Sequence, residues 1–207
     1  MIKALIFDLD ETLIGSKDAL LFFFRQMYEH LGLPFPEDKA ELFYTLPEKG
    51  FLELMLPDPE ILAKAKRFKE NFDPRLHLIS LTLKPFVRET LAAVHGRCKL
   101  ALATNRGPTT PAVLKHFDLE RYFEYVVHAR TLAEPKPHKI VVSTILDKLA
   151  ASAGETLLVG DSEIDVETAK NGGVRSVIVG EKARPGFGDF GLPDLSGLPA
   201  LLDKLEG

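Results

Sequence analysis

The sequence predicts an α/β protein with a parallel β-sheet between two layers of helices and a small helical domain inserted after the first strand. Two observations lead to this prediction. Short apolar runs alternate along the chain with helical patterns, which is typical of a parallel sheet covered on both faces. One stretch of 66 residues, from Gly15 to Ser80, has helical patterns alone and interrupts the alternation.

Five apolar runs have the length of buried strands, and the first of them ends directly in acidic residues, as a buried strand does at the edge of a sheet. The expected strands are Lys3–Phe7, Lys99–Ala103, Tyr125–His128, Thr156–Val159 and Ser176–Val179. The expected helices between them are Pro85–Val94, Pro111–Phe117, Lys139–Leu149 and Ile164–Asn171. We expect Gly172 to end the last of these helices, and an irregular segment, Pro185–Pro199, to lead to a final helix that ends near Leu205.

The long stretch after the first strand contains helical patterns at Asp18–Leu31, Glu48–Met55 and Pro59–Phe72, separated by prolines. Connections within an alternating sheet are normally short. We therefore interpret residues 15–80 as a helical cap domain, and residues 1–14 and 81–207 as the α/β core. The alternative is that these helices pack on the sheet as additional core.

Composition excludes several classes of function. With 207 residues, 45% of them hydrophobic and 27% charged, the chain has the composition of a globular protein. The formal net charge of −4 offers no basic surface to nucleic acid or to a membrane. The lone Cys98 cannot form an internal disulfide, and no apolar run is long enough for an export signal. We expect a cytoplasmic protein that is a monomer or a weak homodimer.

Polar side chains follow the expected strands where each strand ends, and ligands of open parallel sheets bind at this edge. The first strand is followed by Asp8, Asp10 and Thr12, the second by Thr104, Asn105 and Arg106, and the fourth by Asp161 and Asp165, with Lys136 preceding the fourth. Neighbouring carboxylates repel one another, and a divalent cation relieves the repulsion; oxygen ligands favour Mg²⁺. A carboxylate can attack phosphorus and a second carboxyl group can transfer protons, so the set predicts phosphoryl transfer.

These segments resemble the four motifs of the haloacid dehalogenase superfamily. The matching residues are Ile6–Leu13 (IFDLDETL), Ala103–Asn105 (ATN), Lys136–Pro137 (KP) and Gly160–Asp165 (GDSEID). The resemblance extends from residue 2 to about residue 180 and is greatest to the phosphoglycolate phosphatase-type branch, which has a helical cap. It implies a Rossmann-like core and a Mg²⁺ cofactor.

The resemblance also implies roles for individual residues. Asp8 would be the nucleophile and a metal ligand, and Asp10 the general acid and base, with its backbone carbonyl on the metal. Asp161 would ligate Mg²⁺, and Asp165 would support that ligand from one helical turn further on. Dehalogenases of the superfamily lack the second aspartate, so Asp10 indicates an oxygen leaving group.

Four residues are expected to bind the substrate. By the same resemblance, Thr104 and Lys136 would bind the phosphoryl group and stabilise its charge during catalysis. Asn105 lies in the same motif. Arg106 follows it and can receive a second anionic group of the substrate, such as a carboxylate.

The main departure from the pattern of this branch is at Glu11, and a minor one is Lys139, which stands where a second proline often follows the motif lysine. Glu11 stands where glycine is usual, and the resulting Asp-x-Asp-Glu-Thr sequence resembles the phosphatases of the RNA polymerase carboxy-terminal repeat, which lack a helical cap at this point. We expect a Mg²⁺-dependent phosphatase of a small phosphorylated metabolite, with phosphoglycolate as the first candidate. The alternatives are a phosphomutase, a protein phosphatase with the same nucleophile motif, and a non-catalytic binding or regulatory module.

Overall fold

The computed structural model describes residues 1–45 and 50–206 of the chain. Its residues form two compact units, one composed of Met1–Gly15 and Leu83–Gly207 and the other of Ser16–Thr82. The first part of the expected helix Glu48–Met55 lies outside the described residues. Within the part of the chain that is described, no helix combines the length and the apolar character needed to cross a membrane.

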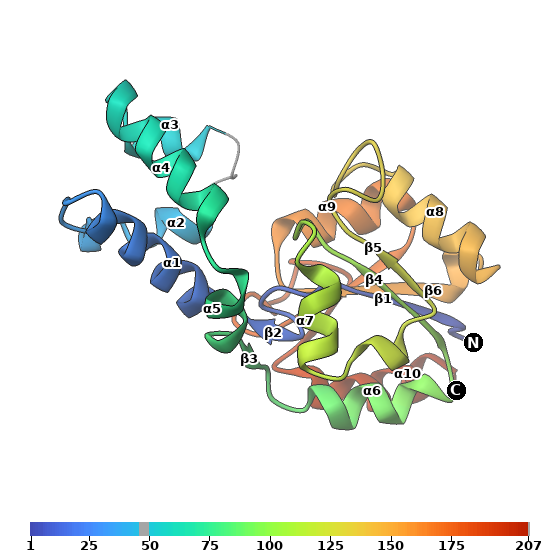
Figure 1. Cartoon of the computed structure of the whole chain (residues 1–207). Helices are drawn as coiled ribbons and strands as arrows, with labels where there is room; N and C mark the ends of the chain where they lie inside the picture. Colours follow the sequence, from blue (N-terminus) through green and yellow to red (C-terminus); the bar gives the residue numbers. More distant parts are fainter. Residues whose placement is uncertain (46–49, 207) are drawn as a thin grey trace. The chain divides into compact units, whose positions relative to one another are not determined.

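The larger unit is built on a six-stranded sheet with the strand order β5-β4-β1-β6-β7-β8, in which all pairs are parallel (Figure 1). Its strands are β1 (Ala4–Phe7), β4 (Lys99–Ala103), β5 (Tyr125–Val127), β6 (Thr156–Gly160), β7 (Arg175–Val179) and β8 (Phe190–Leu192). The predicted parallel sheet is confirmed. β8 is an additional strand that lies within the segment expected to be irregular; its three residues include Gly191, which weakens any strand pattern.

Strand β1 lies in the middle of the sheet and positions the residues that follow it. It pairs with β4 on one side and β6 on the other, so that Phe7 lies opposite both Leu102 and Val159. All four residues of β1 are completely buried. The next backbone N–H, that of Asp8, donates to the carbonyl of Val159 at 2.8 Å. Asp8 is therefore fixed at the centre of the carboxyl edge of the sheet.

Helices cover both faces of this sheet, as predicted. The helices of the unit are α6 (Val87–His95), α7 (Thr110–His116), α8 (Ile140–Leu149), α9 (Glu163–Gly172) and α10 (Leu198–Glu206). Figure 1 shows α8 and α9 on one side of the sheet and α6 and α10 on the other. The apolar core under α8 joins Ile6 and Leu158 of the sheet to Val142 and Ile145 of the helix.

The expected end of helix α9 needs a correction. Gly172 is still helical, and the residue that ends the helix is Gly173, which has the left-handed φ of 71°. Gly172 has a different function, because a Cβ at this position would lie 2.4 Å from Cβ of Val142 on α8. Its lack of a side chain is what allows α8 and α9 to approach each other.

The smaller unit is helical and has a core of its own. It contains α1 (Lys17–His30), a 3-10 helix (Glu37–Lys39), α2 (Leu42–Thr45), α3 (Phe51–Met55), α4 (Pro59–Asn71) and α5 (Pro74–Ile79). Phe24, Phe43 and Phe51 pack ring against ring, with centroids 4.7 to 5.5 Å apart. The chain passes between the units through β2 (Ile14–Gly15) and β3 (Thr82–Leu83), which form a two-stranded sheet.

The close approach of α8 and α9 leads to a stability prediction. We expect Gly172→Ala to lower the free energy of unfolding by about 1 to 3 kcal/mol, because the added methyl group overpacks the contact with Val142. Urea denaturation measures the change. The control is Gly154→Ala, where a Cβ would meet no atom within 4 Å. Equal stability of the two variants would contradict this account of Gly172.

Candidate active site

The carboxyl end of β1 carries a buried ion pair. Asp8 is 6% exposed and Lys136, from the loop between β5 and α8, is 7% exposed. The Nζ of Lys136 donates to Oδ1 of Asp8 at 2.6 Å and to Oδ1 of Asp165 at 2.7 Å. One ammonium group therefore joins the first strand to helix α9.

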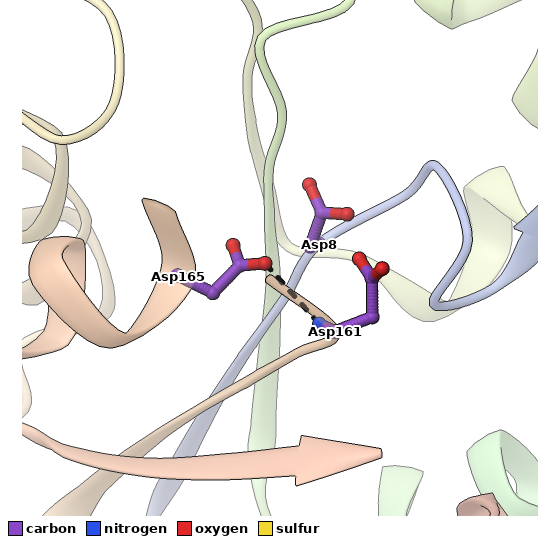
Figure 2. Close-up of side chains that lie close together, drawn as sticks. All are labelled: Asp8, Asp161 and Asp165. Carbon is purple, nitrogen blue, oxygen red and sulfur yellow. Dashed lines mark hydrogen bonds between the residues drawn. The ribbon is translucent and has the colours of Figure 1, made fainter. Parts of the chain in front are cut away.

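Three carboxylates meet at this point. Oxygen atoms of Asp8, Asp161 and Asp165 lie within 4.8 Å of one another; Figure 2 shows the three side chains together, with the backbone N–H of Asp161 bonded to Asp165. The Oδ2 of Asp165 accepts from the backbone N–H groups of Asp161 and Ser162 at 3.2 and 3.1 Å and from the hydroxyl of Ser162 at 2.6 Å. Asp165 thus caps the start of α9, while the carboxylate of Asp161 has no such role in the helix.

The approach of Asp165 to the end of β6 requires a glycine. A Cβ on Gly160 would lie 2.3 Å from Cγ of Asp165, which is closer than any real contact. The sequence Gly160-Asp161 therefore ends the strand and leaves room for the carboxylate that turns back from α9. Because this carboxylate also binds Lys136, the glycine indirectly determines where the lysine lies.

Burial and like charges change the pKa values of these groups. Burial raises the pKa of Asp8 to about 8, against the lowering effect of Lys136, and the charges of Asp165 and Asp10 add to the rise. Burial likewise raises the pKa of Asp161 to about 6, with contributions from Asp165 and Glu11. Burial lowers the pKa of Lys136, but the charges of Asp165 and Asp8 outweigh it, so that Lys136 is held in its charged form.

The charges of this cluster do not balance. Lys136 pairs with Asp8 and Asp165 but not with Asp161, so the three carboxylates, when ionised, carry more negative charge than one ammonium can balance in a site that is largely shielded from water. A divalent cation removes such an excess, and a set of carboxylate oxygens suits Mg²⁺. The chemistry of the donor set therefore fits the cofactor that the sequence predicts.

The residues after β4 surround Lys136. The backbone N–H of Thr104 donates to Val127 at 3.0 Å, and its hydroxyl, which is buried, accepts the backbone N–H of Arg106 at 3.1 Å. The side-chain amide of Asn105 accepts from the N–H of Lys136 at 2.9 Å and donates to its carbonyl at 3.0 Å. Asn105 thus fixes the backbone that carries the lysine, a contact that the sequence motif alone does not reveal.

The guanidinium group of Arg106 forms an ion pair with the carboxylate of Asp10. Its Nε atom is 3.0 and 3.2 Å from the two carboxylate oxygens of Asp10, and a second guanidinium nitrogen contacts Oδ1 at 2.5 Å. The two residues are 96 positions apart in the sequence. The structure therefore joins the expected proton-transfer residue to the residue expected to receive a second anion.

Two further residues at the edge of the site follow Asp10. Glu11 has the left-handed φ of 61°, a conformation in which glycine is usual, and its carboxylate accepts from Lys84 at 3.1 Å. The hydroxyl of Thr12 lies 3.4 Å from oxygens of both Asp8 and Asp161. Thr12 has no assigned role in the sequence prediction, although its place four residues after Asp8 in the first motif is a signal that would have found it.

Comparisons with known proteins identify the family to which the chain belongs. Residues 5–179 match the model of the haloacid dehalogenase-like hydrolase family, and the chain belongs to this family. A "Phosphorylated carbohydrates phosphatase" of Thermotoga maritima is 32% identical over 84% of this chain and 83% of its own length. A phosphoglycolate phosphatase of Vibrio vulnificus is 31% identical over 84% of this chain and 82% of its own.

A solved structure gives the same result for the fold. A HAD-superfamily hydrolase, subfamily IA, variant 1, from Geobacter sulfurreducens has a TM-score of 0.87 at 29% identity and covers 97% of this chain and 96% of its own. The superfamily resemblance and the fold class predicted from the sequence are therefore confirmed. The expectation of an enzyme of the phosphatase type is confirmed by the names of the curated relatives.

The raised pKa of Asp161 leads to a prediction about stability. A carboxyl group whose pKa is raised by folding stabilises the folded state below its unfolded value near 4, and this contribution is lost as the pH rises through about 6. With a chelator present, we expect Asp161→Asn to increase the free energy of unfolding at pH 7.5 by about 1 to 2 kcal/mol, a figure reduced for partial exposure. The gain should fall to less than half of this value at pH 4.5, where the unfolded chain still loses most of the proton and the folded chain keeps it.

Urea denaturation at the two pH values tests this prediction. The control is Glu167→Gln, which removes an exposed carboxylate from the same helix. A stability gain that is the same at both pH values would mean that the charge of Asp161 is not its cause.

Proposed function

We propose that this chain is a Mg²⁺-dependent phosphatase of small phosphate monoesters that acts through an aspartyl-phosphate on Asp8. The observation that carries the proposal is the cluster of Asp8, Asp161 and Asp165, in which the ammonium of Lys136 pairs with Asp8 and Asp165. A nucleophile of this kind needs its negative charge but must meet a phosphoryl group that is itself negative. The excess of carboxylates supports a cation at the same point.

Asp8, Asp161 and the backbone carbonyl of Asp10 would hold the ion. When bound, Mg²⁺ supplies positive charge to the phosphoryl oxygens and lowers their repulsion of the attacking carboxylate. Asp165 is already engaged by α9 and by Lys136, and we propose that it positions the other groups. Lys136 and Thr104 would stabilise the charge that develops on the transferring phosphoryl group.

Two proton transfers complete the reaction. In the first half, a carboxylate oxygen of Asp8 bonds to phosphorus, the bond to the leaving oxygen breaks, and Asp10 gives this oxygen its proton. In the second half, Asp10 takes a proton from a water molecule, the water oxygen bonds to phosphorus, and Asp8 leaves as a carboxylate. The products are an alcohol and inorganic phosphate, and Asp10 is ready for the next cycle.

The proposed substrates are small. The named relatives include phosphatases of phosphorylated carbohydrates and of phosphoglycolate, which supports a phosphorylated metabolite with few carbon atoms. The helical unit Ser16–Thr82 is inserted a few residues after Asp10, and we propose that it acts as a cap domain and selects such substrates. Phosphoglycolate is the first compound to try.

The nucleophile and the metal are tested together. We expect the protein to release inorganic phosphate from small phosphate monoesters with Mg²⁺, to lose this activity with a chelator, and to regain it with excess Mg²⁺. Asp8→Asn should reduce the release to background because the amide is not a nucleophile. Circular dichroism checks the fold, and the control is Asp147→Asn, an exposed aspartate of α8. Full activity in the chelator would exclude the metal role, and transfer of phosphate to a second sugar without release would indicate a phosphomutase.

The proton-transfer role of Asp10 has a separate test. Asp10→Asn should lower kcat by about 100-fold or more, because the same group serves both halves of the reaction. The measurement is a burst experiment with a good leaving group, such as p-nitrophenol, which needs no proton. We expect the first half to be nearly preserved with this substrate and the acyl phosphate to accumulate. A variant with unchanged kcat and a higher KM would show that Asp10 only binds the substrate.

A further inference from the structure

The contact between Arg106 and Asp10 conflicts with the role proposed for Asp10. Both carboxylate oxygens lie 3.0 to 3.2 Å from Nε of the guanidinium, and one of them also contacts a second nitrogen. A guanidinium group has only donors. The lone pairs of Asp10 that face Arg106 therefore cannot carry a hydrogen, whereas protonation of a leaving group requires a hydrogen on this carboxyl group. Asp10 is therefore free to use both of its oxygens for proton transfer after Arg106 has moved.

The structure limits how Arg106 can move. Its backbone N–H donates to the hydroxyl of Thr104 at 3.1 Å, and its carbonyl accepts from Ala129 at 3.1 Å. The motion therefore belongs to the long side chain. Arg106 follows Thr104, the proposed phosphoryl-binding residue, by two positions in the chain. Its side chain is therefore close enough to reach other groups of a substrate whose phosphoryl group is bound at Thr104.

The ion pairs of the site differ in how easily they can be opened. The side chains of Lys136, Asp8 and Asp165 are at most 8% exposed, and their separation would leave buried charges without partners. The side chain of Asp10 is 32% exposed, so water can solvate it when Arg106 leaves. The pair of Arg106 and Asp10 is thus better suited to exchange than the pairs of Lys136, and a planar carboxylate is the partner that best replaces another carboxylate on a guanidinium.

We propose that a carboxylate on the substrate replaces Asp10 as the ion-pair partner of Arg106. Asp10 is then released for proton transfer. Arg106 is then a specificity-determining residue. Phosphate monoesters with a carboxylate close to the phosphoryl group activate the site, whereas esters of the same size without a carboxylate leave Asp10 in its ion pair with Arg106. This inference rests on the proposed function and names its substrate class.

A pair of substrates and two variants test the inference. The substrates are phosphoglycolate and 2-hydroxyethyl phosphate, which has a neutral hydroxymethyl group in place of the carboxylate. For Arg106→Gln we expect kcat/KM for phosphoglycolate to fall about 10- to 100-fold, the usual effect of losing a hydrogen bond between charged groups. In the same variant, kcat for 2-hydroxyethyl phosphate should rise several-fold, because Asp10 is no longer held. Arg88→Gln, an exposed arginine of α6, is the control and should change neither.

The other outcomes overturn either the role of Arg106 or the proposed function. An equal loss with both substrates would make Arg106 a merely structural residue, and a loss with phosphoglycolate alone would make it an anion site with no hold on Asp10; either overturns the inference. A wild-type enzyme that prefers the neutral ester also overturns it but leaves the proposed function standing. Hydrolysis of no monoester in the presence of Mg²⁺ would instead refute the proposed function. Arg106→Lys, which keeps the charge but loses the planar fork, should fall between wild type and Arg106→Gln and serves if the glutamine variant does not fold.

Discussion

The structure depends on one electrostatic constraint, which is that Asp8, Asp161 and Asp165 must share a small volume that is largely shielded from water. Each is brought there by a different part of the backbone: the central strand β1, the end of β6, and the first turn of α9. Parallel pairing of β1 with β6 aligns the ends of the two strands, and the capping of α9 turns the third carboxylate back toward them. The hydrophobic core supplies the free energy that holds these like charges together.

The other charges near the cluster are arranged in pairs. Lys84 forms an ion pair with Glu11, and Arg106 forms one with Asp10, so each of these two carboxylates is neutralised by its own cation. The central cluster differs because Lys136 serves two carboxylates. In the absence of a cation, burial and the neighbouring carboxylates raise the pKa of Asp161, so its ionised form destabilises the folded chain. Reactivity toward a negatively charged ester and stability of the folded chain therefore make opposite demands on the same side chain.

Local patterns were sufficient to predict most of the sheet and the residues of the charged cluster. Strand runs and strand-end motifs are short-range signals, and parallel topology brings the strand ends together. Other features depend on side-chain directions that no local pattern contains. The amide of Asn105 bonds to the backbone of Lys136, and Arg106 reaches Asp10 across 96 positions. The role of Gly172 likewise follows from its contact with Val142, while Gly173 has the backbone conformation that ends the helix.

The close contact between Gly160 and Asp165 also restricts how this sequence can change over evolutionary time. A side chain at position 160 would need a smaller residue at position 165, and the smaller residue would remove both the cap of α9 and a partner of Lys136. A side chain at position 160 therefore disturbs the carboxylate of Asp165. A replacement of Gly160 should therefore be accompanied by a change at position 165, and a homologue that retained the aspartate without the glycine would have to rebuild the first turn of α9.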